Sequence, residues 1–483
     1  MFCFGSEIKA LLKHPQITAE LNLHELPNYL NWGMSSRSTL FNGIEKLSPG
    51  HFLKYSKKDG LAIKRYWSPI KQNLEYTGLS ENDICEHILS LLRQSIDARM
   101  MSDVPFGVFL SGGIDSSLNV ALMYELMTRP IDTYTVGFKE LEKYNELEYA
   151  RKISKIYKTN HHEILIDHND AFPILQELTW HEDEPNADPV CIPLYFLSKL
   201  TRDSGTIVIQ VGEGSDEQFC GYRWMLREYN FEKSYWKAFN KAPKFAKLAI
   251  HNISKPIFNN LNFPELSEYF RRASNNEQLY WGGNPIFSPS FLHHLISEEY
   301  SNLNNIPSTF ASTLHSEALS LKPDADYLQR IAYVELSNRL SEILLMRVDK
   351  IGMAHSIEAR VPFLDHRLVE FSMSIPPNLK APNKHTTKHI LKKAVKGILP
   401  EEIINRRKQG FWAPVNEWLR NEWKDYAYST IMNNELFKSG IFNKKYVNKL
   451  FYLHSNGKRN FGLQLFSLLT LALWHEKFFG KNK

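Results

Sequence analysis

The chain has 483 residues, of which 43% are hydrophobic and 23% are charged, and its formal net charge is only +5. The length allows a large core and more than one domain, and the composition is ordinary for a water-soluble globular protein. So small a net charge, without a long run of Lys and Arg, gives no reason to expect a nucleic-acid partner. The four cysteines form no C-x-x-C pair, which argues against a zinc site or a disulfide framework and indicates a reducing cytoplasm.

The ends of the chain carry no signal for a membrane. Glu7 and Lys9 interrupt the first segment, so no secretory leader is visible there. The most apolar stretch, residues 461–474, is too short to span a bilayer and contains Gln464. We therefore expect a buried C-terminal helix, a cytoplasmic location and no membrane partner.

The pattern divides the chain into three parts. We predict a small α+β segment, which looks like the end of a domain, at residues 1–70. A polar linker is expected at residues 71–83, and a large domain at residues 84–480. In the first part, Asp59-Gly60 lies between two strand-like runs and is a strong hairpin signal. The elements expected there are helices at 6–12 and 21–32 and strands at 52–55 and 61–67.

The large domain begins with alternating elements. Ser80-x-x-Asp83 resembles a capping box and precedes apolar residues at helical spacing. Alternation of strands and helices predicts a parallel sheet with helices on both faces, whose ligands bind at the carboxyl ends of the strands. Beyond Gly221 the chain turns aromatic and helical, without clear strands. The expected strands are 108–110, 133–138, 163–166 and 206–211, and the expected helices are 116–127, 146–157, 171–178 and 193–202.

The most informative stretch is Ser111-Gly112-Gly113-Ile114-Asp115-Ser116, a glycine-rich turn between a buried strand and a helix. Helix N-termini favour anions, the glycines allow close approach, and a carboxylate can hold a hydrated Mg²⁺. No Gly-Lys-Ser/Thr and no G-x-G-x-x-G accompanies the turn, which excludes a P-loop and a dinucleotide fingerprint. The stretch therefore predicts a polyphosphate site.

A second glycine-rich loop, Gly212-Glu213-Gly214-Ser215-Asp216-Glu217, follows another apolar strand. Its three carboxylates would repel one another unless a cation or a basic side chain shares them. Because it ends a predicted central strand, we expect it beside the first loop and not as a solvated acidic turn.

Together these stretches resemble the synthetase part of class B, glutamine-dependent asparagine synthetases, which have a pyrophosphate loop of the ATP pyrophosphatase type. The resemblance covers nearly the whole chain. Besides the two loops it rests on these strings: Ser102-Asp103-Val104-Pro105, Thr135-Val136-Gly137-Phe138, His161-His162-Glu163, Asp183-Glu184-Pro185, Asp349-Lys350, Glu358-Ala359-Arg360-Val361-Pro362-Phe363-Leu364-Asp365 and Arg407-Lys408-Gln409-Gly410-Phe411.

The resemblance implies an adenine nucleotide alpha hydrolase-like α/β fold with a helical C-terminal part. It also implies an ATP-dependent amide ligase with Mg²⁺, in which the aspartate β-carboxylate is adenylated and ammonia then displaces AMP. Glu213 would act in forming the acyl-adenylate and in deprotonating ammonia, while Lys408 would neutralise charge on the α-phosphate. Asp115 and Asp216 would hold Mg²⁺, and Asp115 would thereby act in catalysis. The residues implied in ATP binding are Leu110, Ser111, Gly112, Gly113, Asp115, Ser116, Val136, Val211 and Gly212.

Other polar residues invite weaker hypotheses. Lys350 is a candidate for charge neutralisation, although a lone lysine is usually a surface group. His161 and His162 point to opposite faces of a strand, which favours a structural role over a metal site. Glu358, Arg360 and Asp365 predict an internal charge network; an Arg that binds the substrate carboxylate is the alternative.

The chain departs from the family at its N-terminus, because Phe2 stands where the glutaminase nucleophile would be and Cys3 lies in an apolar context. We expect Cys3 not to be the nucleophile and the chain by itself to use free ammonia. A truncated gene, a separate glutaminase partner or a homodimer are open alternatives. An unfinished sheet exposes edges, so we expect residues 1–67 to be the least stable region.

Two alternatives to asparagine formation remain. Relatives with the same adenylation core act on sugar acids, peptides or β-lactam precursors, so the acceptor carboxylate is open. The chain could instead be a catalytically silent binding module, against which the intact Asp115, Glu213, Asp216 and Lys408 argue.

Overall fold

The computed structural model describes residues 2–71, 78–139, 141–260, 264–283, 285–408, 410 and 412–480. Most of the expected linker, residues 72–77, lies outside the described residues, as do Gln409 and Phe411 of the string at 407–411. The parts of the chain considered below belong to the described ranges.

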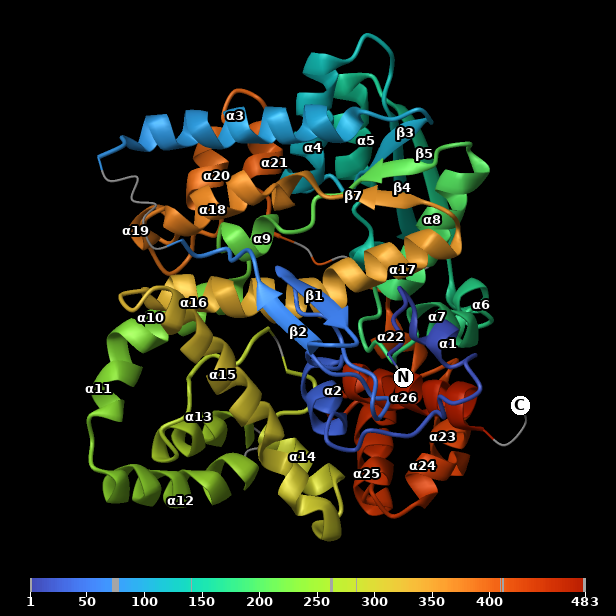
Figure 1. The fold of residues 1–483 in the computed structure, drawn as a ribbon, viewed down its shortest axis with the longest axis vertical. Coiled ribbons are helices and arrows are strands. Elements are labelled where there is room, and N and C mark those ends of the chain that lie inside the picture. The colour runs from blue at the N-terminus through green and yellow to red at the C-terminus, as the bar shows by residue number, and fades with distance from the viewer. Residues whose placement is uncertain are drawn as a thin grey trace.

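The central feature is a parallel sheet, in which five of the described strands follow the order β5-β4-β3-β6-β7 (Figure 1). Four of the strands confirm the sequence prediction to within a few residues. The fifth, β7, contradicts the expectation of no strand beyond Gly221. It has three residues, Glu358-Ala359-Arg360, too few and too polar for a strand pattern, and it forms only because β6 offers a parallel edge. The bounds are β3 Phe106–Phe109, β4 Asp132–Phe138, β5 Asn160–Ile166, β6 Val208–Gln210 and β7 Glu358–Arg360.

Helices cover both faces of this sheet, which confirms the predicted fold class. On one face α3, α4 and α5 share a core with Val108 and Leu110, and on the other α7, α8 and α17 share a core with Ile209 and Val211. The capping box at Ser80 is confirmed, since its side chain accepts a hydrogen bond from the Asp83 N–H. The helices are α3 Glu81–Met100, α4 Ile114–Leu126, η1 Glu142–Tyr144, α5 Leu147–Tyr157, α6 His168–Ala171, α7 Leu175–Glu182, α8 Cys191–Asp203 and α17 Met346–Ala354.

The remaining C-terminal part is helical. Within the described residues no helix is both long and apolar enough to cross a bilayer. Its elements are α9 Ser215–Gln218, α10 Arg223–Phe231, η2 Glu232–Trp236, α11 Lys237–Asn240, α12 Lys244–Asn260, α13 Pro264–Ser274, α14 Pro289–Leu295, η3 Glu298–Asn305, α15 Ile306–Leu321, α16 Tyr327–Val334, η4 Glu335–Leu345, η5 Pro362–Leu364, α18 His366–Ser374, α19 Pro377–Lys380, α20 His389–Ala394, α21 Glu401–Asn405, α22 Val415–Trp418, α23 Lys424–Asn433, α24 Glu435–Lys438, α25 Lys444–Ser455 and α26 Gly462–Phe479.

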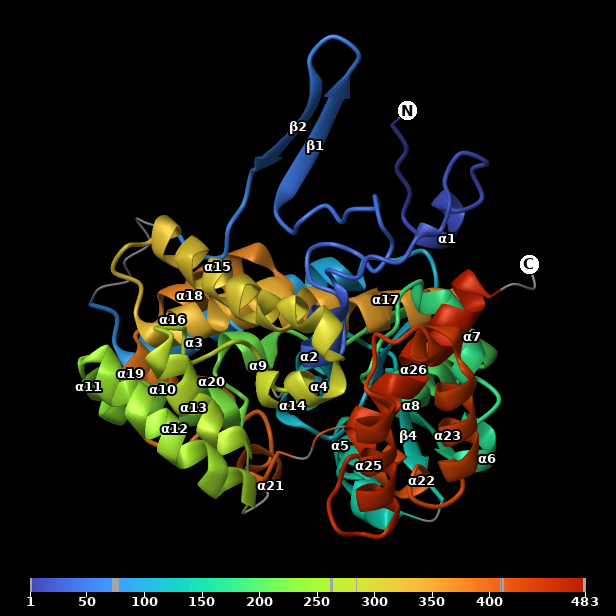
Figure 2. The same cartoon turned by 90° about the horizontal axis from the view of Figure 1, so that it is seen from below.

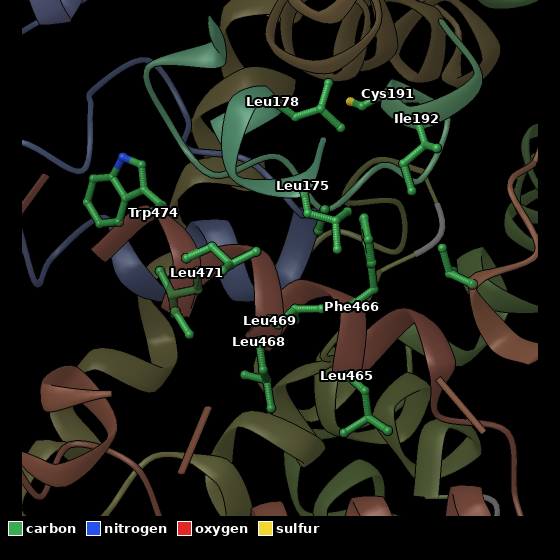
Figure 3. Close-up of a cluster of buried hydrophobic side chains, with 14 of the residues drawn as sticks. Leu175, Leu178, Cys191, Ile192, Leu465, Phe466, Leu468, Leu469, Leu471 and Trp474 are labelled. Atoms are coloured by element: carbon green, nitrogen blue, oxygen red, sulfur yellow. The ribbon is translucent and has the colours of Figure 1, made fainter. Parts of the chain in front are cut away.

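Helix α26 is the buried C-terminal helix that the sequence predicts. Its Leu465, Leu468 and Leu469 are fully buried, and the helix packs against α7 (Figure 3). The apolar side chains surround the axis because neighbours cover nearly every face, so the helix has no amphipathic stripe. A fully buried Leu side chain contributes roughly 1.5–3 kcal/mol from removal of apolar surface from water, which makes α26 a main source of stability.

The N-terminal segment divides into two parts of different character. The antiparallel hairpin of β1 (His51–Ser56) and β2 (Gly60–Arg65) stands away from the body (Figure 2), and every residue of β2 is exposed. Helix α2 (Leu26–Trp32) is instead completely buried, whereas α1 (Ile8–Leu11) has no buried residue. We therefore restrict the expected low stability of residues 1–67 to the exposed hairpin, and we expect the buried helix α2 to be stable.

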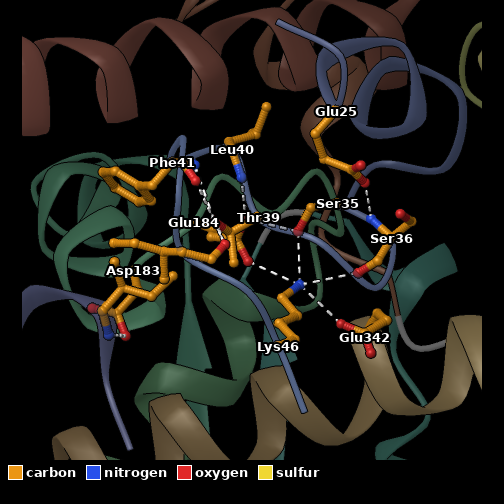
Figure 4. Close-up of polar contacts among 12 residues, drawn as sticks. Glu25, Ser35, Ser36, Thr39, Leu40, Phe41, Lys46, Asp183, Glu184 and Glu342 are labelled. Atoms are coloured by element: carbon orange, nitrogen blue, oxygen red, sulfur yellow. Dashed lines mark hydrogen bonds and ion pairs between the residues drawn. The ribbon is translucent and has the colours of Figure 1, made fainter. Parts of the chain in front are cut away.

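Polar contacts tie the N-terminal residues outside the hairpin to the large domain. The Lys46 ammonium lies 2.9 Å from both the Glu184 and the Glu342 carboxylates, and Glu184 also accepts a hydrogen bond from the Ser35 hydroxyl at 2.7 Å (Figure 4). Asp183 pairs with Lys9 at 2.9 Å and with Lys350. The Asp183-Glu184 string and Lys350 thus anchor the N-terminal segment.

This division predicts where proteases cut. We expect trypsin to cleave first in the exposed hairpin, at Lys57 or Lys58 in its turn, because local opening there breaks few buried contacts. Residues 26–46 should stay protected until the whole domain unfolds. Mass spectrometry of the first fragments checks this, and an early cut inside residues 26–46 would contradict the division.

Candidate active site

The first loop bends at Gly112, between β3 and α4. Gly112 has a φ of +67°, and a Cβ there would lie 2.5–2.6 Å from atoms of Tyr149 and Ala150 in α5. Glycine is therefore required by packing as well as by the turn. Gly113 precedes α4 as its N-cap, and no side chain caps that end of the helix. The first N–H groups of α4 thus remain available for an anion.

Two hydroxyl groups hold this loop in shape. The Ser111 N–H donates to Ser116 Oγ at 3.2 Å, the two hydroxyl oxygens lie 3.2 Å apart, and the Gly113 N–H donates to Ser111 Oγ at 3.3 Å. The loop is pre-shaped by its own polar groups, and those groups sit at the helix terminus where phosphate oxygens would bind.

The second loop lies directly against the first, because β3 and β6 are neighbours in the sheet. A Cβ built on Gly212 would stand 2.8 Å from the Asp115 Cβ. The placement of both loops at adjoining strand ends agrees with the expectation for a parallel sheet.

A buried lysine joins the two loops. The Lys388 ammonium lies 2.6 Å from the Asp115 carboxylate and 2.8 Å from that of Asp216, and its side chain is 6% exposed. Lys408 pairs with Asp216 as well and lies 4.5 Å from the centre of the Tyr222 ring. Burial works against the charge of Asp216, but Lys388 and Lys408 hold its pKa well below its usual range.

Each of the three carboxylates in the second loop has its own positively charged partner, as charge repulsion requires. Besides the pairing of Asp216, Glu213 contacts Arg347 at 3.1 Å. Glu217 accepts a hydrogen bond from the Tyr222 hydroxyl at 2.6 Å, and Arg339 donates to that hydroxyl at 2.9 Å. Burial and the neighbouring Asp216 raise the pKa of Glu217 to about 7.

The sequence-predicted residues fall into two groups. Those of the two loops and Lys408 come together at the ends of β3 and β6, with Ser111, Asp115 and Glu213 partly exposed. The side chains of Leu110, Val136 and Val211 are at most 5% exposed and belong to the apolar cores. Any contact they make with a nucleotide would therefore use mainly backbone atoms.

Other candidates have structural partners. Arg360 pairs with Glu358 at 2.7 Å and Asp365 pairs with Arg367 at 2.9 Å, so the three predicted residues belong to separate ion pairs, and Glu358 is 57% exposed. His161 contacts Thr133 and Glu163, and His162 stacks on Tyr134, so both rings are occupied by strand neighbours. Within the described ranges, no group of three or more metal-binding side chains is found.

Four basic residues at the site escaped the sequence prediction: Arg339, Arg347, Lys388 and Arg406. Arg347 also pairs with Asp188, and Arg406 donates to the Gly112 carbonyl at 3.1 Å. Arg406 lies two residues before Lys408, and Arg347 lies two residues before Asp349. Their closeness to these recognised strings could have indicated that both arginines belong to the site. Lys388 carries no such signal, because its partners come from two distant loops.

A cavity of about 690 Å³ lies near these groups, although none of its described lining residues belongs to the second loop. It lies among α10, η2, η4 and the segment around Trp412, and Asp188 and Arg339 belong to its wall. These two residues contact Arg347 and Tyr222, respectively. The cavity is therefore linked to Glu213 and Glu217 through one intervening side chain in each case.

A buried acid behind this wall predicts a pH effect on stability. Burial raises the pKa of Glu182 to about 8, although Cys191 and Asn186 donate hydrogen bonds to it. A raised folded-state pKa stabilises fully below the unfolded value of about 4.3 and ceases to do so as the pH passes about 8. We expect Glu182→Gln to match the parent near pH 4 and to melt several degrees higher at pH 8.5. Melting curves at both pH values check this. The exposed Glu148→Gln is the control, and equal curves at pH 8.5 would contradict it.

Uncapped helix N–H groups, glycine loops at adjoining strand ends and a cluster of lysines and aspartates are typical of an α/β protein with a site for a phosphorylated ligand. Comparison with known families is consistent with this. The asparagine synthase family model matches residues 87–476, and the glutamine amidotransferase domain model matches residues 1–67. The chain belongs to the asparagine synthase family, whose members are ATP-dependent ligases, which confirms the resemblance that the sequence carries.

Individual relatives agree with the family. Asparagine synthetase [glutamine-hydrolyzing] 1 of Bacillus subtilis is 29% identical over 98% of this chain and 71% of its own length. Asparagine synthetase [glutamine-hydrolyzing] 3 of the same organism is 30% identical over 90% of this chain and 67% of its own length. Amidase chyE of Penicillium rubens is 26% identical over 80% of this chain and 61% of its own length. The chain thus spans about two thirds of the length of these relatives.

Proposed function

We propose that this protein activates a carboxylate with ATP and converts it to an amide with ammonia, with aspartate giving asparagine as the reference reaction. In the first step a carboxylate oxygen attacks the α-phosphorus, and the bond to the β-phosphate breaks to release pyrophosphate. In the second step ammonia attacks the acyl carbon, AMP leaves with the bonding electron pair, and a proton is released. The convergence of Asp115 and Asp216 on one buried lysine carries the proposal.

The basic residues perform the electrostatic work of the first step. A carboxylate and a polyphosphate repel each other, so cations fixed near the α-phosphorus favour the transition state. Lys408 is 40% exposed and can move from Asp216 toward a phosphate, whereas Lys388 is buried and fixed. The N-terminus of α4, with Ser111, Gly112, Gly113 and Ser116, is placed to receive the phosphates.

The same two carboxylates support a Mg²⁺ site. One or two carboxylates are the protein ligands that Mg²⁺ commonly takes when it also binds phosphates, and Asp115 and Asp216 converge here, where the ion would share their oxygens with Lys388 and Lys408. We propose that these two residues hold the ion, which would supply further charge neutralisation at the pyrophosphate. Leu110, Val136, Val211 and Gly212 are proposed to border the nucleotide.

Glu213 is proposed to act in forming the acyl-adenylate and then in accepting a proton from the incoming ammonia. Its carboxylate is 25% exposed, and Arg347 holds one of its oxygens. The other oxygen has no hydrogen bond to a described residue, so it can approach a bound substrate. Hydrogen bonding to Arg347 orients the carboxylate, which is the requirement for acid–base work at a fixed atom.

The division of the chain and its partners also remain proposals. We propose a glutaminase-like segment at 1–70, a linker at 71–83 and the synthetase domain at 84–480, in a cytoplasmic protein. Cys3 is exposed, and no residue described near it suggests an activated thiol, so we propose free ammonia as the nitrogen donor of this polypeptide. A separate glutaminase or a second copy of the chain stays a prediction.

The experiment is pyrophosphate release from ATP and Mg²⁺ with a panel of carboxylic acids, supplied in turn with ammonium and glutamine. We expect release, AMP and an amide product with at least one acid and ammonium. Turnover supported by glutamine would overturn the donor proposal. ATP binding without pyrophosphate from any acid would instead favour a binding module.

A further inference from the structure

The cavity among α10, η2 and η4 has a size and chemistry that do not match aspartate. Resting on the proposed function, we propose that it is the acceptor site and that it takes a carboxylic acid with a bulky aromatic or apolar body. The argument uses its position, its size and its charge.

The position suits an acceptor. Asp188 in the wall pairs with Arg347, whose other nitrogen lies 3.1 Å from Glu213. Trp412, also in the wall, lies four residues after Lys408. A molecule in the cavity would thus lie one side chain away from the acidic loop, with its reactive carboxylate at the end toward the proposed phosphate site.

The size favours a larger body than that of aspartate. A volume of about 690 Å³ falls within the range of pockets that enclose drug-sized ligands, roughly 300–1,000 Å³. Aspartate has one methylene group between polar ends and would leave most of these walls without a partner. The walls include the apolar side chains of Trp32, Ile286 and Ile343, and an apolar ligand that covers their remaining exposed surface lowers the free energy of the complex.

Aromatic side chains add a preference for a flat ligand. Trp224 and Phe231 of α10 line the cavity, and Trp224 stacks on Tyr222 with ring centroids 4.3 Å apart. Arg339 lies 4.9 Å from the Tyr222 ring centre and fixes that pair from the side of η4. Rigid aromatic walls favour stacking with a ligand ring.

The charge favours an acid. Arg223, Arg227 and Lys384 are exposed lining residues, and Asp188 is the one acid among the described lining residues. Arg227 pairs with Glu228, whereas Arg223 and Lys384 have no ion-pair partner within the described part of the chain. Unpaired cations at an entrance raise the local concentration of an anionic substrate.

The test compares N-benzoyl-aspartate and phenylacetate with aspartate in the pyrophosphate assay with ATP, Mg²⁺ and ammonium. We expect at least one aryl acid to give a kcat/KM tenfold or more above that of aspartate. Ser234 is an exposed residue of the wall, and Ser234→Trp would fill part of the cavity. We expect this variant to raise the KM for the aryl acid at least tenfold. Ser429→Trp, an exposed serine in α23 away from the cavity, is the matched control.

The outcomes separate this inference from the proposed function. If aspartate is the best acid, or if Ser234→Trp and Ser429→Trp behave alike, the acceptor inference is wrong while the ligase activity stands. If no acid gives pyrophosphate, the proposed function fails. Titration calorimetry of N-benzoyl-aspartate then tests ligand binding to the cavity independently of catalysis. Binding that is lost in Ser234→Trp supports this ligand class, and no binding to the parent overturns it.

Discussion

Replacing Glu213 by Ala or Gln is expected to lower pyrophosphate release by about 10²- to 10⁴-fold, the range that positioned acid–base groups contribute. Both substitutions remove the carboxylate that Arg347 orients at 3.1 Å, and Gln also keeps its volume. Affinity for ATP should survive, because Glu213 is not among the groups at the N-terminus of α4. The rate is measured with a pyrophosphate-coupled assay, and ATP binding with titration calorimetry.

The matched control for this change is Glu358→Gln. Glu358 is an acid on the neighbouring strand β7 whose side chain is 57% exposed and pairs with Arg360. This variant should keep the parent rate. Glu213 variants that release pyrophosphate as fast as the parent would remove Glu213 from the mechanism, while a loss of ATP binding would assign it to the nucleotide site.

Replacing Lys388 by Met is expected to lower the free energy of unfolding by about 3 kcal/mol, since removal of one partner leaves buried charges uncompensated. Met keeps the length of the side chain, and both residues share the strain of the φ of +53° at this position. Asp115 would then lose its ion-pair partner among the described residues, while Asp216 would keep Lys408. The exposed Lys396→Met is the control and should leave the stability unchanged.

The pH dependence sharpens this prediction. The pKa of Asp216 is lowered in the folded protein, so its contribution is present above the unfolded value of about 3.9 and is lost as the pH falls through the folded value. The pKa of Lys388 is raised, so its contribution is lost only at high pH. The difference between parent and Lys388→Met should be largest near neutral pH and shrink toward pH 3. Urea titrations across this range measure it, and a constant difference would exclude the charge explanation.

The sequence predicted those features that depend on residues close together in the chain. Strand ends, the turn at Gly112 and the carboxylates of the second loop are encoded within ten residues or so, and their meeting follows from the rules of parallel sheets. Lys388 could not be found this way, because its role depends on Asp115 and Asp216 converging from separate loops. The short strand β7 was likewise invisible, since its edge position comes from β6.

Some residues were found for an incomplete reason. The sequence attributed Gly112 to a close approach by a ligand, whereas the structure also gives it a packing role against Tyr149 and Ala150. Asp183 and Glu184 were recognised as part of a family string, yet they bind Lys9, Lys350 and Lys46 of the surrounding scaffold. A motif marks a constrained position, and only its contacts reveal which constraint applies.

The deep burial of helix α2 has a consequence for how this protein can be divided. Tyr29 donates a hydrogen bond to the Ser467 carbonyl of α26 at 2.7 Å, and Leu26 and Leu30 are fully buried. The stretch that matches the amidotransferase model therefore contains a helix, α2, that forms part of the hydrophobic core of the synthetase domain. An expression fragment that begins at the start of the synthetase match would expose the hydrophobic surface that α2 covers, and we expect it to aggregate. Gene fusions and domain exchanges should therefore keep the first fifty residues together with the synthetase domain of the same protein.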